Sequence, residues 1–233
     1  MLLIREGNIF TTQCQTIVNT VNCIGIMGAG IAYEFRIRHP EMFAKYKKIC
    51  DQKLMTIGKL WIYDINDKQV TYNKVLNFPT KQDWKFPSKI EYLEKGLKKF
   101  QDTYKSKNIT SIAFPLLGTD KGGINKEESF EIMKKYLKHL DIDIEIWYFN
   151  PNAKDDLYDR FKSKFLELDD ETIKEQSKLR INFVKKIREA LMKNEINSLS
   201  GLLQVKGIGD VTLEKLYNFT RKYQKNNQNL FNI

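Results

Sequence analysis

Up to residue 150, the apolar positions along the chain alternate between two spacings. Short runs rich in Ile, Val and Phe predict β-strands, and longer segments with apolar residues three and four positions apart predict helices. We expect strands at 1–7, 16–22, 58–65, 74–78, 109–114 and 142–149, and helices at 28–52, 88–107 and 126–140. This order predicts an α/β fold: a three-layer α/β/α domain with a mixed, largely parallel sheet.

Two residues refine the expected helix boundaries. Pro40 interrupts the helical pattern of residues 28–52 and suits the first turn of a second helix. Ser88 stands where the helix of residues 88–107 begins, and we expect its hydroxyl to act as the N-cap.

The pattern changes after Pro151. Residues 152–168 fit a last helix of the first domain, whereas residues 169–178 are polar and charged, which is typical of a linker. From Arg180 onward the spacing is helical and is broken only at residues 205–210. We therefore predict three parts: a domain at 1–165, a linker at 166–178 and a small all-α domain at 179–233.

Composition and charge restrict the class of protein. Apolar residues make up 42% of the chain and aromatic residues 12%, which is enough for a packed core. The formal net charge is +10, and residues 170–233 carry 12 Lys and Arg against 7 Asp and Glu. A basic surface concentrated in one quarter of the chain favours a polyanionic partner, although a solvated lysine-rich face is the alternative.

Cysteine and histidine supply too few ligands for a metal site. The three cysteines lack CxxC spacing and only two histidines are present, so we predict reduced thiols, no metal and no cofactor. The N-terminus becomes charged after four residues, and no apolar run approaches the roughly 18 residues that cross a bilayer. We therefore expect a cytoplasmic protein.

Two glycine-rich loops follow separate predicted strands. The first glycine loop, residues 23–30, comes directly after Asn22, and the second glycine loop, residues 116–124, follows the strand at 109–114. Glycine at a strand end lets backbone N–H groups approach a phosphate. The first glycine loop alone is equally compatible with a tight turn, and it does not fit the dinucleotide-binding fingerprint. The two loops together predict a ligand with a diphosphate.

Lys81 follows a third strand and is bracketed by Pro79 and Pro87. If the strands are parallel, this lysine lies at the same sheet edge as the two glycine loops, with Trp84 close enough to contact a ligand. An ordinary solvated lysine is the alternative. Its position favours a role in the site.

Three motifs, "VNTVNCIGIMGAGIA", "NFPTKQDW" and "LLGTDKGGI", occur in this order and together resemble the macrodomain family. Within that family they are similar to the DarG type, the antitoxins of DarT toxins, which are related to terminal ADP-ribose protein glycohydrolases. The resemblance covers about residues 1–155. It implies an ADP-ribose pocket and a DNA ADP-ribosyl glycohydrolase that removes ADP-ribose from a nucleobase, typically thymidine, in single-stranded DNA.

The resemblance also implies roles for individual residues. Lys81 matches the catalytic lysine, Asn22 the contact to the distal ribose, and Gly7, Asn8 and Ile9 the adenine contacts. Asn8 stands where macrodomains usually have Asp, and Phe149 is a candidate either for stacking on adenine or for core packing. The remaining ADP-ribose positions are Gly28, Ala29, Gly30, Ile31, Ala32, Thr80, Gly118, Thr119, Asp120, Lys121, Gly122, Gly123 and Ile124.

Two chemical questions stay open in the sequence. Related protein glycohydrolases use an Asp at the position of Gly122, whereas Asp120 lies two residues earlier, and this favours DNA over carboxylate-linked ADP-ribose. Lys81 as an ammonium would stabilise the departing base, and as a neutral amine it would attack the ribose C1″.

Residues 197–224 resemble a helix–hairpin–helix DNA-binding motif. The hairpin Lys206-Gly207-Ile208-Gly209 would bring backbone amides to a phosphate, assisted by Lys215 and Arg221. A protein-docking or dimerising module is the alternative.

The leading interpretation is a hydrolase that acts on ADP-ribosylated DNA, with DNA and a DarT-like toxin as expected partners. A non-catalytic ADP-ribose reader and a hydrolase of ADP-ribosylated protein are the alternatives. Lys81 favours the enzyme over the reader, because a reader does not need a lysine at the scissile bond.

Overall fold

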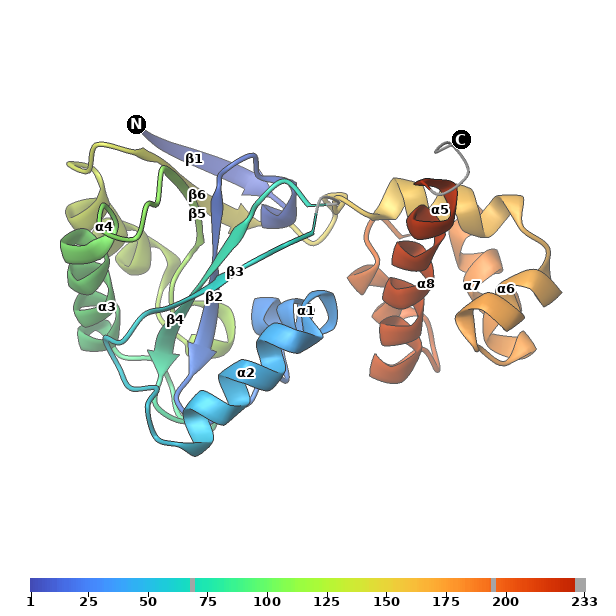
Figure 1. The fold of residues 1–233 in the computed structure, drawn as a ribbon, viewed down its shortest axis with the longest axis horizontal. Helices are drawn as coiled ribbons and strands as arrows, with labels where there is room; N and C mark the ends of the chain where they lie inside the picture. Colours follow the sequence, from blue (N-terminus) through green and yellow to red (C-terminus); the bar gives the residue numbers. More distant parts are fainter. Residues whose placement is uncertain (68–69, 194–195, 229–233) are drawn as a thin grey trace. The chain divides into compact units, whose positions relative to one another are not determined.

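The computed structural model describes residues 1–67, 70–193 and 196–228, with side chains up to Arg221 in the last helix. The chain divides into two compact units, Met1–Phe149 and Asn150–Ile233 (Figure 1).

The first unit is built on one six-stranded sheet in the order β1-β6-β5-β2-β4-β3. Every neighbouring pair is parallel except β3 and β4, which are antiparallel. The mixed, largely parallel sheet predicted from the sequence is therefore confirmed. The strands are β1 (Leu2–Gly7), β2 (Thr16–Asn22), β3 (Trp61–Asp64), β4 (Lys74–Lys81), β5 (Ser111–Pro115) and β6 (Asp143–Phe149).

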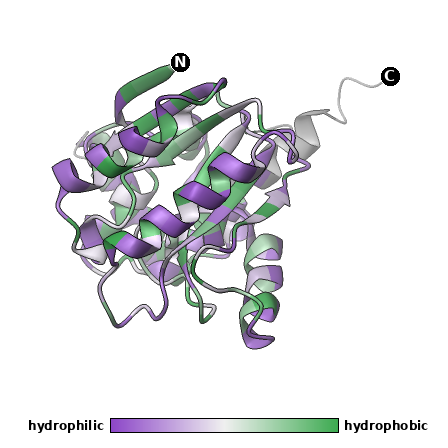
Figure 2. Cartoon of the chain, turned by 90° about the vertical axis from the view of Figure 1, so that its left-hand side faces the viewer, coloured by the Kyte–Doolittle hydropathy of each residue, from purple (hydrophilic) through white to green (hydrophobic). Residues whose placement is uncertain are grey.

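Helices cover both faces of this sheet (Figure 1). Helices α1 (Gly30–Arg38) and α2 (Pro40–Asp51) pack in one hydrophobic cluster with Ile17 of β2, and α3 (Ile90–Thr103) and α4 (Lys126–Leu137) pack in another with Val18. Successive residues of a strand point to opposite faces, so Ile17 and Val18 anchor the two outer layers. In Figure 2 the strands are predominantly hydrophobic, and the helices in front mix hydrophilic and hydrophobic positions.

Pro40 opens α2 as predicted, but the prediction for Ser88 is wrong. The N-cap of α3 is Lys89, which makes no side-chain cap hydrogen bond. The backbone N–H of Ser88 instead donates to the carbonyl of Gly122 at 2.9 Å. A contact to a distant loop takes the place of a local cap.

In the described part of the second unit, all regular elements are helices. They are α5 (Tyr158–Glu167), α6 (Asp170–Ser177), α7 (Ile181–Met192), the 3₁₀-helix η3 (Ser200–Gln204) and α8 (Asp210–Gln228). Apolar residues from all five elements are buried: Phe161, Phe165, Ile173, Val184, Ile187, Leu191, Leu202, Leu213, Leu216 and Phe219. Among the described residues, no helix combines the length and apolar character needed to cross a bilayer.

The predicted boundaries of the second part are wrong in two respects. Helix α5, assigned to the 1–165 domain, belongs to the second unit, where Phe165 packs against Phe219 with ring centroids 6.1 Å apart. The predicted linker at 166–178 contains α6, whose N-cap Asp169 accepts a hydrogen bond from the N–H of Thr172 at 2.9 Å. Only Ile173 and Ser177 of this helix are buried, so its charged composition hides the helical signal.

Candidate active site

The carboxyl ends of five parallel strands meet at one edge of the sheet. Strands β5, β2 and β4 are neighbours there, and the Cα of Asn22, the last residue of β2, pairs with that of Lys81, the last residue of β4. At the other side of the same edge, Gly7 of β1 pairs with Phe149 of β6. The strand order therefore brings both glycine loops, Lys81 and the predicted adenine-binding residues to one edge.

Asn22 organises the first glycine loop. Its Oδ1 accepts hydrogen bonds from the N–H groups of Ile24 and Ile26 at 3.0 and 3.2 Å, and its Nδ2 donates to the carbonyl of Ile26 at 2.6 Å. The hydroxyl of Tyr46 donates to the carbonyl of Asn22 at 2.6 Å, and burial raises the pKa of Tyr46, which keeps this donor protonated. The side chain predicted to contact a ribose thus also fixes the loop beside that ribose.

The first glycine loop leads directly into α1. Gly30 has a φ of +57° and a Cβ there would meet nothing within 4 Å, so the space beside this backbone is open. Gly28, Ala29 and Gly30 are exposed, and Ala29, the N-cap, makes no side-chain cap hydrogen bond. An uncapped helix N-terminus next to open space favours an anionic group. Ala32, one turn into the helix, is buried.

The second glycine loop is tightly folded. Its backbone closes through hydrogen bonds from Ile124 N–H to the Gly118 carbonyl at 3.0 Å and from Gly122 N–H to the Thr119 carbonyl at 2.7 Å. A Cβ on Gly118 would approach Ile124 Cδ1 to 2.7 Å and Ser88 Cβ to 3.2 Å, so it would crowd its neighbours, and the φ of +69° favours glycine at this position. Asp120 is exposed and has a φ of +45°, a conformation that costs energy for a residue other than glycine.

Lys81 contacts the second glycine loop and the segment that follows β4. Its Nζ donates to the carbonyl of Lys121 in the second glycine loop and, at 3.5 Å, to the carbonyl of Trp84. The side chain is half-buried, and desolvation lowers its pKa from the ordinary lysine value. Two backbone carbonyls therefore hold the amine beside Asn22 and the second glycine loop. Thr80, the preceding residue, is buried within β4.

At the predicted adenine end of the site, the side chain of Asn8 already makes a hydrogen bond within the protein, whereas the side chain of Phe149 is exposed. Asn8 is buried, and its Oδ1 accepts a hydrogen bond from the N–H of Phe10 at 3.1 Å as the N-cap of the 3₁₀-helix η1 (Ile9–Thr11). The side chain of Phe149 is 61% exposed, so it does not pack in the core and its ring is free to stack on a ligand. Ile9 is buried.

Two features of the site left no signal in the sequence. The carbonyl of Trp84 and the N–H of Ser88 are backbone groups, and their contacts depend on the path of residues 82–89, named the lysine loop here. Across the described part of the chain, no group of three or more His, Cys, Asp and Glu side chains could hold a metal ion.

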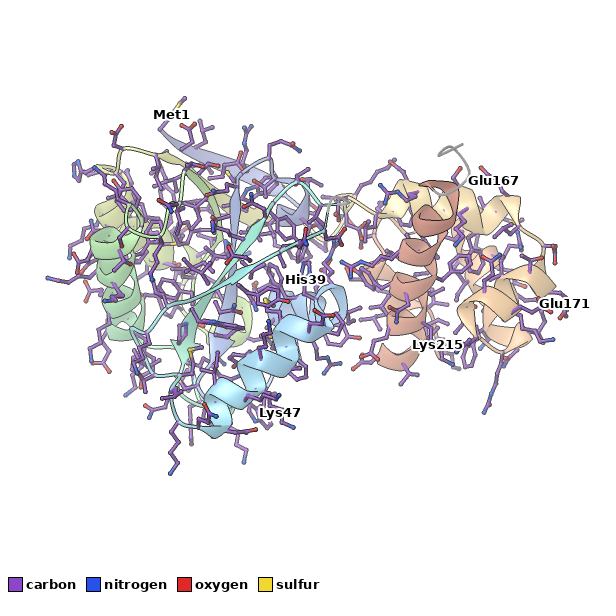
Figure 3. The ribbon with its side chains drawn as sticks, viewed as in Figure 1. Met1, His39, Lys47, Glu167, Glu171 and Lys215 are labelled. Carbon is purple, nitrogen blue, oxygen red and sulfur yellow. The ribbon has the colours of Figure 1, made fainter. Side chains whose placement is uncertain are left out.

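The predicted DNA-binding hairpin in the second unit lies between η3 and α8. Lys206, Gly207 and Gly209 are exposed, Ile208 is buried, and Gly207 has a φ of +89°. The two residues of α8 that were predicted to bind DNA differ from Lys206 in their surroundings. The Nζ of Lys215, labelled in Figure 3, donates to the carbonyl of Lys178 at 2.7 Å, and Arg221 is half-buried.

Comparison with known proteins identifies related sequences and structures. The Macro domain model matches residues 18–133. A DNA ADP-ribosyl glycohydrolase from Mycobacterium tuberculosis is 36% identical over 148 residues, which are 63% of this chain and 42% of that protein. A DNA ADP-ribosyl transferase–DNA ADP-ribosyl glycohydrolase fusion protein from Thermosipho africanus is 31% identical over 160 residues and is covered to 41%. The chain thus spans about two fifths of the length of these curated relatives.

Two solved structures are similar in fold. The macrodomain of Mycobacterium tuberculosis DarG superposes with a TM-score of 0.61 and 36% identity, covering 63% of this chain and 97% of that one. Thermosipho africanus DarTG in complex with ADP-ribose gives a TM-score of 0.59 and 29% identity, covering 64% of this chain and 42% of that one.

Proposed function

Because the chain belongs to the macrodomain family through its first unit, we propose that it is a DNA ADP-ribosyl glycohydrolase, an enzyme that hydrolyses the bond between ADP-ribose and a nucleobase of DNA. The names of the curated relatives support this activity. The observation that carries the proposal is the position of Lys81, held beside Asn22 and the second glycine loop.

We assign ADP-ribose to the carboxyl edge of the sheet. The diphosphate would lie between the first and second glycine loops, where exposed backbone and the N-terminus of α1 favour an anion. Adenine would reach the exposed ring of Phe149, and the distal ribose would lie near Asn22 and Lys81. The complex of Thermosipho africanus DarTG with ADP-ribose supports this choice of ligand.

Lys81 acts in this proposal as a charged hydrogen-bond donor. A lysine ammonium carries three N–H donors, and two of them point to the carbonyls of Lys121 and Trp84. The third is left for an oxygen of the departing base, where negative charge develops as the glycosidic bond breaks. The oxygen of a water molecule then bonds to the ribose C1″, and the proton that this water loses goes to the base, which regains its original structure.

A nucleophilic role for Lys81 is the alternative mechanism, and the lowered pKa of Lys81 is the observation that favours it. The two mechanisms differ in their dependence on pH. A charged donor loses activity as the pH rises through the pKa of Lys81, whereas a nucleophilic amine gains activity over the same range. A covalent adduct between ADP-ribose and the protein, detected by mass spectrometry, would establish the nucleophile.

The finer features of the substrate and partners are part of the same proposal. We propose thymidine in single-stranded DNA as the modified site. We also propose a DarT-like toxin as the source of the modification, and the fusion of the two activities in the Thermosipho africanus relative supports this source. The hairpin of residues 206–209 would hold the DNA backbone without reading its sequence, in keeping with the excess of Lys and Arg in residues 170–233.

The direct test uses a single-stranded oligonucleotide that carries ADP-ribosyl-thymidine, followed by mass spectrometry. The wild-type protein is expected to remove the mass of ADP-ribose, and the Lys81→Ala variant is expected to leave it in place. Tight binding of an oligonucleotide that stays intact would instead establish a reader. Release of ADP-ribose from modified protein, but not from the oligonucleotide, would establish a protein hydrolase.

A further inference from the structure

The exposed aromatic rings of the described chain are concentrated at one edge of the first unit. Of its Phe and Trp side chains, those with an exposed ring are Trp84, Phe86 and Phe149, with exposed fractions of 51%, 65% and 61%. All three follow or end strands at the carboxyl edge of the sheet. Exposed aromatic surface is costly in water unless a partner covers it.

The strand order separates these rings into two sides of the proposed site. Phe149 ends β6, whereas Trp84 and Phe86 follow β4, and β5 and β2 lie between. Three steps between neighbouring strands correspond to about 14 Å. An ADP-ribose whose adenine is at Phe149 and whose distal ribose is at Lys81 leaves Trp84 and Phe86 uncovered. These two rings therefore lie on the side of the leaving base.

The lysine loop that carries the two rings is held at several points. The N–H of Lys85 donates to Oδ1 of Asp83 at 2.9 Å, and the N–H of Phe86 donates to the carbonyl of Asp83 at 3.3 Å. The carbonyl of Gln82 accepts from the N–H of Cys23 at 3.1 Å, and Ser88 binds Gly122. The Nζ of Lys81 also reaches the carbonyl of Trp84. The rings are thus presented by a loop with a fixed path.

The charge around the rings favours a polyanion. Lys85 lies between the two aromatic residues in sequence, and its Nζ is 5.8 Å from the centroid of the Trp84 ring. Lys81 at the end of β4, Lys89 on the lysine loop and Lys121 on the second glycine loop add three positive charges. The acidic residues of the same region are Asp83 and Asp120. Aromatic rings interleaved with lysines are typical of surfaces that bind single-stranded nucleic acid, where bases stack and cations meet phosphates.

We propose that Trp84 and Phe86 form a stacking platform for the unpaired bases that flank the modified nucleotide. The inference rests on the proposed function and deepens it, because it makes single-stranded DNA the substrate through a surface separate from the ADP-ribose pocket. The two rings are separated in sequence by one residue, Lys85, and together they offer more stacking area than one modified base covers. Bases in a duplex are stacked on one another and cannot use the platform.

The test compares two substrates that differ only in flanking bases: ADP-ribosyl-thymidine as a nucleoside and the same nucleoside within a short single-stranded oligonucleotide. Phe86→Ala is expected to raise the KM for the oligonucleotide by about 5- to 100-fold and to leave kcat/KM for the nucleoside unchanged. Trp84→Ala is expected to raise the KM for the oligonucleotide more than the KM for the nucleoside, and Trp84→Phe to restore most of that loss. Phe149→Ala is the matched control, since it should weaken both substrates equally.

Two results would overturn the platform. An equal loss on both substrates would mean that Trp84 supports Lys81 or the modified base itself. An unchanged oligonucleotide KM in both alanine variants would mean that the rings serve another partner, such as a protein.

A direct binding measurement keeps the inference testable if the wild-type protein hydrolyses neither substrate. All three tryptophans lie in the first unit, so the quenching of tryptophan fluorescence by an unmodified oligothymidine reports on that unit alone. Quenching that is lost in Trp84→Phe would support the platform while the proposed function fails. Quenching that is absent, or equal in Trp84→Phe, would overturn the platform as well.

Discussion

Among the described residues, one lysine in each unit has a lowered pKa, and the two lysines occupy very different surroundings. The Nζ of Lys81 donates to carbonyls of two loops at the open edge of the sheet. The Nζ of Lys164, on α5, donates to the carbonyl of Phe219 at 2.7 Å and lies 3.5 Å from the centroid of the Phe219 ring. Desolvation lowers the pKa of both, that of Lys164 to about 8.

A lowered pKa therefore does not by itself identify a reactive lysine. Lys164 is 5% exposed inside a helical core, where a substrate has no access. Lys81 is perturbed less but stands beside two glycine loops in which Gly28, Gly30 and Gly123 are exposed. A catalytic role therefore requires that a substrate can reach the amine. Burying the charged amine of Lys164 lowers the stability of the folded state.

Replacing Lys81 tests the first half of this comparison and should give the largest effect. Lys81→Ala removes the proposed donor to the departing base, and we expect kcat to fall by about 100- to 1000-fold. Lys81→Arg should restore little, because a planar guanidinium cannot occupy the position of an ammonium between two carbonyls. Single-turnover kinetics on the ADP-ribosylated oligonucleotide provides the measurement.

The control for this prediction is Lys98→Ala, which removes an exposed lysine on α3. It should change kcat by less than about twofold. Calorimetry should show that Lys81→Ala still binds free ADP-ribose, since the glycine loops remain. A variant that lost ADP-ribose binding and kcat together would place Lys81 in ligand binding instead.

Replacing Lys164 tests the second half. The folded pKa of about 8 lies below the unfolded value of 10.5, so between these pH values the unfolded chain binds more protons and stability rises with pH. Below the lower value both states are charged, and the cost of burying the charge is fully present. We expect Lys164→Met to raise the free energy of unfolding near neutral pH by about 1–3 kcal/mol.

The measurement is urea unfolding of both proteins at pH values of about 7 and about 10. The difference between variant and wild type should shrink at the higher pH, because the wild-type lysine is then largely neutral when folded. Subtracting the two proteins removes the titration of other groups. A difference that is constant with pH would show that Lys164 stays charged in the folded state.

Much of the first unit was predictable because its determinants are local. The strands are apolar runs, parallel neighbours end at the same edge, and glycine and Lys81 follow those ends directly in the sequence. The path of the lysine loop was not predictable, because it depends on backbone contacts such as that between Ser88 and Gly122.

The second unit was harder to predict because one of its helices buries only two residues. Helix α6 buries Ile173 and Ser177 and is otherwise charged, so it resembled a linker. The burial of Lys164 had no signal either, since a lysine on a helix is usually solvated. The hairpin at 206–209 was located because its glycines interrupt the helical pattern.

Glycines of the two units offer a third test. A Cβ on Gly122 would lie 2.7 Å from Ser88 Oγ, whereas a Cβ on Gly209 would meet nothing within 4 Å. We expect Gly122→Ala to destabilise the protein by about 1–2 kcal/mol and Gly209→Ala to leave stability unchanged. If the hairpin holds DNA, Gly209→Ala should still weaken DNA binding several-fold, because the added methyl group obstructs a phosphate.

Thermal unfolding and fluorescence anisotropy with a labelled oligonucleotide measure the two effects separately. Ser88→Ala combined with Gly122→Ala should recover part of the lost stability, since Ser88 Oγ is the closest atom. Equal destabilisation by both glycine substitutions would mean that the hairpin is as tightly packed as the second glycine loop.

The smallest expected effect is a difference between Lys206 and Lys215 in their contribution to the salt dependence of DNA binding. Lys206 is exposed at the hairpin, whereas Lys215 already donates to the carbonyl of Lys178. Lys206→Ala should therefore reduce the slope of log K against log salt by about 0.7, the contribution of one phosphate contact in single-stranded DNA, and Lys215→Ala should change it less. Anisotropy titrations over a series of salt concentrations give these slopes. Equal slopes for wild type and both variants would exclude the hairpin from DNA binding and favour a protein-docking role, because an exposed lysine that meets a phosphate must release a counterion.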